Sequence, residues 1–236
     1  MTSELDVLSG IIRPRPATRL RPRAFFTAWS GVLTFAFDGF SETLLSIKRE
    51  IERRLPGLRP EYPGSRWPKV TLGALREGRT LTRAEARILL DLCAAWNEAV
   101  GPELQPQTVE ALSVVVYLCR SLEKRVITHR IPLEGGPPDP NDAPPPAHRA
   151  QVEHILRQFT EPHLESYLDL LTCTEHDVAY YRAYHPGTTL VYDLPPGALP
   201  FLDAFVRAVE ERLPGYYGWF TPESRHVTLR TLAHTF

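Results

Sequence analysis

SRHVTLRTL, the stretch from Ser224 to Leu232, is the part of the sequence on which the predicted fold and function depend. Its β-branched residues and alternating pattern predict a β-strand that carries a histidine and a threonine on one face. An earlier stretch, SRWPKVTLGAL (Ser65 to Leu75), reads as a second copy of it. Together the two copies predict two similar lobes, each of which offers one such strand to a shared central cleft.

The segments in front of the two strands repeat as well. TTLVYDL (188–194) matches GVLTFAF (31–37), and LPFLDAFVRAVEERLPG matches ETLLSIKREIERRLPG without a gap. Amphipathic helices resemble one another, but the shared Pro-Gly stop, SR pair and VTL favour a true repeat over coincidence. Strand, helix, stop, loop and strand thus occur twice in the same order. This predicts an α+β, bilobal protein whose duplicated strand–helix–strand units form antiparallel sheets around the cleft, related by a pseudo-twofold axis.

The composition shifts predict five segments along the chain. They are a Pro/Arg-rich arm (1–24), a first lobe (25–132), a Pro-rich linker or flap (133–147), a helical connection (148–184) and a second lobe (185–236). The arm is interpreted as an extended, solvated tail, with a phosphate- or partner-binding arm as the alternative. Ser41 and Thr82 are predicted helix N-caps, the latter in a capping box. Pro162 is expected to kink or split the helical connection.

Composition narrows the class of protein. The 236 residues are 43% hydrophobic, enough for a real core, and the net charge of −1 gives no overall attraction to DNA or to a membrane. Three cysteines without a CxxC argue against a disulfide framework or a structural zinc. No secretion signal or membrane span is recognised, which predicts a cytoplasmic protein. The remaining histidines are too scattered to predict a metal site.

The two strands place chemically useful groups side by side. Because residues two apart share a face of a strand, His226, Thr228 and Arg230 are expected on one face, and Lys69 and Thr71 on one face of the earlier strand. An imidazole can move a proton near neutral pH, and a hydroxyl can donate to a phosphate oxygen. Two such pairs facing each other would give an acid and a base on opposite sides of a phosphodiester.

This arrangement resembles the two-histidine (2H) phosphoesterase superfamily, which includes the RNA 2',3'-cyclic phosphodiesterases, often called 2'-5' RNA ligases, and the plant-type cyclic nucleotide phosphodiesterases. The family is known for two lobes and two H-x-[ST]-x motifs, each after a strand–helix unit. HVTL (226–229) matches the motif in full, and KVTL (69–72) matches it except at the histidine. The resemblance covers about residues 31–132 and 185–236.

The resemblance implies roles for particular residues and a class of ligand. His226 and Lys69 would be the catalytic pair, and the phosphate-binding candidates are Thr71, Thr228, Arg230 and Arg225. For Arg225 a loop salt bridge is the alternative to a substrate contact, and for Trp67 and Trp219 core or rim packing is the alternative to stacking on a base. No metal and no cofactor are needed, since the histidines of this chemistry transfer protons directly. The implied ligand is a nucleotide or an RNA end.

Lys69 is the departure from the family pattern. An ammonium with an ordinary pKa of about 10.4 is a poor base at pH 7, although it can neutralise a phosphate, or act as an acid if burial lowers its pKa. Two hypotheses therefore stay open. One is an enzyme, weak or altered, that acts on a 2',3'-cyclic phosphate, a 2'-5' linked oligonucleotide or a cyclic nucleotide. The other is a catalytically degenerate binding or scaffold protein on the same fold, with a protein partner.

Overall fold

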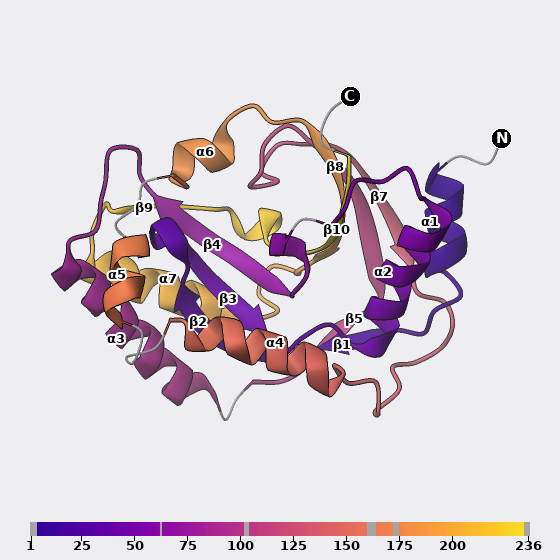
Figure 1. Ribbon diagram of the computed structural model, residues 1–236, viewed down its shortest axis with the longest axis horizontal. Coiled ribbons are helices and arrows are strands. Elements are labelled where there is room, and N and C mark those ends of the chain that lie inside the picture. Colours follow the sequence, from indigo (N-terminus) through magenta and orange to yellow (C-terminus); the bar gives the residue numbers. More distant parts are fainter. Residues whose placement is uncertain (1–3, 62, 102–103, 160–163, 172–174, 234–236) are drawn as a thin grey trace.

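Two four-stranded antiparallel sheets form the centre of the chain in the computed structural model, which describes residues 4–233 except 62, 102–103, 160–163 and 172–174 (Figure 1). The first sheet has the order β2 (Pro22–Thr27), β3 (Leu33–Phe37), β4 (Lys69–Leu75), β9 (Tyr217–Trp219). The second has the order β10 (His226–Ala233), β8 (Gly187–Asp193), β6 (Ala111–Tyr117), β7 (Arg125–Pro132). A small pair joins β1 (Thr18–Leu20) and β5 (Gln107–Val109). The predicted α+β class with antiparallel sheets is confirmed.

Both sheets mix strands from the two predicted lobes. The hairpin of β6 and β7 was expected to belong with β3 and β4, but β6 pairs with β8 in the second sheet. In the opposite direction, β9 pairs with β4 in the first sheet. The physical reason is that β6 is apolar on both faces and nearly all buried, so it is stable only as an inner strand with neighbours on both sides. The sheets therefore do not follow the predicted ranges 25–132 and 185–236.

The helices are exchanged between the sheets in the same way. Helix α2 (Glu42–Arg54) follows β3 of the first sheet, yet it contacts β10 of the second. Helix α7 (Pro200–Arg212) follows β8 of the second sheet, yet its Phe205 stacks on Phe25 of β2 with the ring centroids 3.9 Å apart. Helix α2 thus buries its apolar stripe against the second sheet, and helix α7 buries its stripe against the first.

The repeated sequence has repeated local geometry. Both α2 and α7 have 13 residues, and each ends at a leucine of nearly the same conformation, Leu55 (φ −123°, ψ 65°) and Leu213 (φ −132°, ψ 66°). Short 3-10 turns, Pro63–Ser65 and Pro222–Ser224, then precede β4 and β10. The predicted N-caps are also present, since the Ser41 hydroxyl accepts from an amide of α2 and Thr82 forms a complete capping box at α3 (Arg83–Val100).

The prediction of a solvated N-terminal arm is wrong. Residues Glu4–Ile12 form helix α1, which packs on α2 and buries Leu8, Ile11 and Ile12. The chain then continues as β1, which pairs with β5. The Pro/Arg composition of residues 13–23 hid the apolar residues at helical spacing in front of it.

Three further helices complete the described chain. They are α4 (Pro146–Arg157), α5 (Leu164–Leu171) and α6 (Val178–Arg182). The predicted break at Pro162 lies outside the described residues. The loop before α4 is held in place at Asp142, whose carboxylate accepts from the Thr18 hydroxyl and the Thr43 amide. Among the described residues, the structure contains no helix with the length and apolar character that a membrane span requires.

Candidate functional site

A small pocket lies where β4 of the first sheet approaches β10 of the second. It has a volume of about 60 Å³ and is lined by Gly64, Trp67, Lys69, Thr71, His226 and Thr228. About 10–15 Å³ of such space holds one water, so the pocket has room for a group of about four to six heavy atoms. A phosphoryl group has this size. Four of the six residues singled out from the sequence as site candidates therefore line one pocket.

The alternation of the two strands puts these side chains there. Lys69 and Thr71 are half-buried and face the pocket, whereas Val70 and Leu72 between and after them are fully buried. The same pattern holds in β10, where His226 and Thr228 face the pocket and Val227 and Leu229 lie in the core. The structure thus places each of the two pairs on the side of its strand that faces the pocket.

The neighbours of His226 fix its tautomer and shift its pKa. Its Nδ1 lies 2.7 Å from the carbonyl oxygen of Ser224, and a carbonyl can only accept, so Nδ1 carries the hydrogen and Nε2 is the free acceptor. The pKa of His226 is lowered to about 4, chiefly by burial; the Ser224 hydrogen bond opposes this shift, and the charges of Arg125 and Asp193 lower and raise the pKa respectively. At neutral pH the imidazole is therefore uncharged, and its Nε2 can accept a hydrogen bond or act as a weak base.

Lys69 is also shifted towards neutrality. Its ammonium donates to the carbonyl oxygen of Gly64 and lies 4.3 Å from the centre of the Trp67 ring. Burial, followed by the charge of Lys48, lowers the pKa of Lys69 to about 8. At pH 7 Lys69 is thus mostly charged, but it gives up its proton far more readily than an exposed lysine, whose pKa is about 10.4.

A second buried lysine, Lys48 of α2, connects the two sides of the pocket. Its ammonium pairs with Glu61 and donates to the carbonyl oxygens of Ser65 (2.8 Å) and Leu229 (2.7 Å). Ser65 belongs to the turn before β4, and Leu229 lies in β10. Burial lowers the pKa of Lys48, and the carboxylate of Glu61 opposes the shift. Lys48 therefore fixes β10 against the turn that leads into Lys69.

We expect Lys48→Met to lower the free energy of unfolding by about 3–5 kcal/mol, because it leaves the Glu61 carboxylate and two carbonyls without their buried partner. Chemical denaturation measures this effect. Lys124→Met, at an exposed lysine, is the matched control and should change stability by less than about 0.5 kcal/mol. Equal stability of the two variants would contradict the role given to Lys48.

Arg225 and Arg230 do not line the pocket. Arg225, directly before β10, is buried, and its Nη2 donates to Asp203 of α7 at 2.6 Å, so Arg225 forms the salt bridge that was the alternative to a substrate contact. Arg230 was expected on the face of Thr228, but a register irregularity between these two residues breaks the alternation. Its guanidinium is buried and donates to the carbonyl oxygen of Arg59. The pocket-facing series of β10 therefore stops at Thr228.

The two tryptophans differ in their placement. Trp67 packs against Phe26 and also lines the pocket beneath the Lys69 ammonium. Trp219 is not among the lining residues, since it stacks on Tyr217 and its Nε1 donates to Glu210. Sequence reasoning missed Arg125, which acts on the pKa of His226 from β7. No local motif could have found it, because it lies 101 positions before His226.

Comparison with known proteins adds no family assignment. No protein-family model, no curated protein and no solved structure matches the chain.

Proposed function

We propose that this protein is a 2H phosphoesterase-like enzyme that hydrolyses a 2',3'-cyclic phosphate or a related phosphodiester at a nucleotide or RNA end. The observation that carries the proposal is the pocket of phosphoryl size in which two equivalent strands place a neutral histidine, a lysine of lowered pKa and two threonine hydroxyls. The sequence resemblance supports it, since the same four positions are those of the two motifs. A cytoplasmic location is part of the proposal.

The protonation states define the role of each group. The threonine hydroxyls of Thr71 and Thr228 donate to the non-bridging phosphate oxygens. Nε2 of His226 takes a proton from the water that attacks phosphorus, while the Lys69 ammonium gives its proton to the sugar oxygen that leaves. One P–O bond forms and one breaks, which leaves an imidazolium and a neutral amine. Transfer of one proton from His226 to Lys69 through solvent restores the starting state.

The alternative is a binding or scaffold protein that keeps the pocket and has lost the chemistry. The observation in its favour is that the six lining residues include one histidine, His226, so that no second imidazole is supplied from elsewhere in the described chain. Such a protein would bind a phosphate ester without cleaving it.

The test is hydrolysis of a panel of 2',3'-cyclic nucleotides and 2'-5' linked dinucleotides across the pH range. For the proposed enzyme, kcat/KM should rise as pH passes about 4, because His226 must lose its proton to act as base. It should fall above about 8, because Lys69 must keep its proton to act as acid. Binding without turnover at any pH would favour the alternative, and an alkaline limb that is unchanged in Lys69→Met would exclude Lys69 as the acid.

A further inference from the structure

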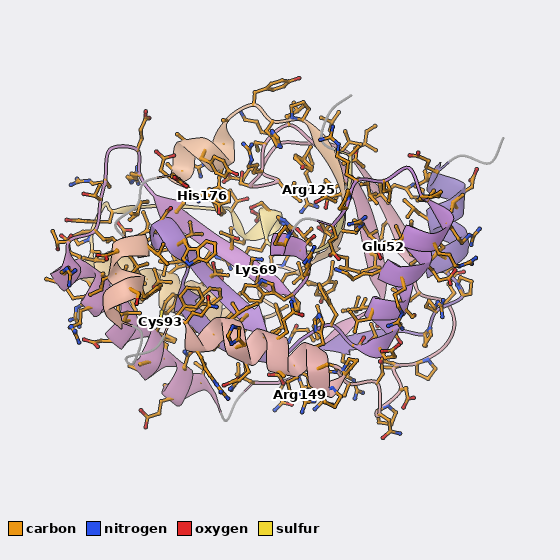
Figure 2. The ribbon with its side chains drawn as sticks, viewed as in Figure 1. Glu52, Lys69, Cys93, Arg125, Arg149 and His176 are labelled. Atoms are coloured by element: carbon orange, nitrogen blue, oxygen red, sulfur yellow. The ribbon has the colours of Figure 1, made fainter. Side chains whose placement is uncertain are left out.

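Strand β7 (Arg125–Pro132) lies at the edge of the second sheet. The sheet order is β10, β8, β6, β7, so β6 pairs with one side of β7, and no strand in the described part of the chain pairs with the other side. The strand begins at Arg125, which is labelled in Figure 2. An edge strand of 8 residues offers a row of backbone groups to another chain unless it is protected.

The side chains of β7 resemble those of an interface more than those of a protected edge. Val126 and Ile127 are each 58% exposed, and they are among the few large apolar side chains that the described chain leaves exposed. Thr128 beside them is exposed as well. Valine, isoleucine and threonine favour strands, whereas edge strands that avoid pairing usually carry several charges. Between Ile127 and the end of the strand the one such charge is Arg130.

The hydrogen-bond pattern shows which backbone groups point to the open side. Leu133, directly after β7, donates from its amide to the Glu110 carbonyl at 2.8 Å. In an antiparallel ladder, opposite residues exchange hydrogen bonds in every second pair. Counting back from Leu133 in the regular part of the ladder, the odd-numbered residues of β7 bond to β6. Thr128 and Arg130 therefore direct both their N–H and their C=O groups to the open side, and Pro132 directs only a C=O there.

These groups are arranged symmetrically about His129. If a second copy of β7 lies antiparallel with a twofold axis at His129, Thr128 of each copy is opposite Arg130 of the other. Each such pair exchanges two hydrogen bonds, and the axis makes two such pairs. Ile127 is then opposite Ile131 of the second copy, so an exposed apolar side chain is covered next to a buried one.

Other positions of the axis fit less well. An axis at Thr128 would pair Arg130 with Val126, where a register shift between β6 and β7 interrupts the regular ladder. An axis at Arg130 would place two guanidinium groups opposite each other, and like charges in this position are destabilising. It would also pair Thr128 with Pro132, which has no N–H to donate.

We propose that this protein forms a homodimer in which β7 pairs with β7 of a second copy, antiparallel, around a twofold axis at His129. The second sheets of the two copies then become one continuous sheet of eight strands. Strand β10, which carries His226 and Thr228, lies at the opposite edge of each sheet, so the two pockets lie away from the interface. The inference goes beyond the proposed function and does not depend on it.

The first experiment compares wild type, Thr128→Pro and Thr128→Ala by sedimentation equilibrium over a range of concentrations. Thr128→Pro removes the N–H that points to the second copy and leaves the hydrogen bonds to β6 in place, whereas Thr128→Ala removes the side chain and keeps that N–H. We expect wild type to dimerise with a micromolar dissociation constant, because the interface is small. Thr128→Pro should raise this constant by about 10- to 100-fold, since each dimer loses two hydrogen bonds. Thr128→Ala should stay within about threefold of wild type.

The second experiment tests the position of the axis by disulfide formation. Directly opposite residues that do not exchange hydrogen bonds have Cα atoms about 4.5 Å apart, which a disulfide can span. His129→Cys should therefore form a covalent dimer on oxidation, seen by non-reducing gel electrophoresis. Val126→Cys is the matched control, because its two copies would lie roughly 20 Å apart along the strands. Wild type controls for the native cysteines.

The outcomes decide the proposal. Wild type that stays monomeric up to millimolar concentration, or folded Thr128→Pro that dimerises as tightly as wild type, would overturn the dimer. Disulfide formation in Val126→Cys as fast as in His129→Cys would overturn the axis at His129. Should circular dichroism show that Thr128→Pro is unfolded, Ile127→Lys replaces it. Its lysine is exposed in the monomer but lies opposite Ile131 in the dimer, so the dissociation constant should rise by about tenfold or more.

Discussion

Replacing His226 with alanine should lower turnover of 2',3'-cyclic phosphates by about 10²- to 10⁴-fold, the usual contribution of a positioned general base. The imidazole is uncharged at neutral pH, and its hydrogen is on Nδ1, which donates to the Ser224 carbonyl. Nε2 is therefore the nitrogen that can accept a proton in the pocket. The methyl group of alanine cannot replace it. KM should change much less than kcat, since the threonine hydroxyls and Lys69 still hold the phosphate.

The matched control for this variant is His154→Ala, at an exposed histidine of α4, which should leave kcat and KM at wild-type values. Both variants should show the circular dichroism spectrum and melting behaviour of a folded protein. Turnover in His226→Ala within about threefold of wild type would remove this histidine from the mechanism.

Replacing Lys69 tests the other half of the proposed chemistry. Lys69→Met removes the proton donor and the positive charge while nearly keeping the length of the side chain, so turnover should fall by about 10²-fold or more. Lys69→His restores the family motif and should keep turnover. Its alkaline limb should move from about 8 towards the ordinary histidine range near about 6.5. The pH dependence of kcat/KM for both variants measures this.

Lys124→Met is again the control, because it removes a lysine that is exposed and outside the pocket. A silent wild type together with an active Lys69→His would show an intact site whose catalysis has been lost, which is the binding-protein alternative. An unchanged alkaline limb in Lys69→His would show that another group supplies the proton.

The pocket could be predicted from the sequence because its four main residues lie in two short copies of one pattern. The alternation of HVTL and KVTL fixes which side chains share a face, and the repeat pairs the two faces. Arg230 could not be placed in the same way, since the register irregularity after Thr228 comes from the pairing of β10 with β8. Arg125 could not be predicted for a related reason. Its position near His226 depends on how the hairpin of β6 and β7, about 100 residues before His226, packs in the fold.

The exchange of helices and strands was also hidden from the sequence. The sequence of an apolar strand such as β6 does not indicate which strand it pairs with, so β6 was assigned to the lobe that is nearest in the sequence. The stripes of α2 and α7 likewise predict burial without saying which sheet provides it. Pairing over long separations is decided by the shape and area of surfaces that form only when the whole chain has collapsed.

The exchange of α2 and α7 has a consequence for how this chain reaches its native state. Lys48 bonds to a residue 181 positions away, and the Tyr217 hydroxyl bonds to the Gly31 carbonyl across 186 positions. Neither half can complete its own core, so the early-synthesised β3, α2 and β4 must remain partly uncovered until β10 has left the ribosome. Folding dominated by such distant contacts is slow and leaves apolar strands open to aggregation. A chain of this design should depend on chaperones more than its modest size suggests.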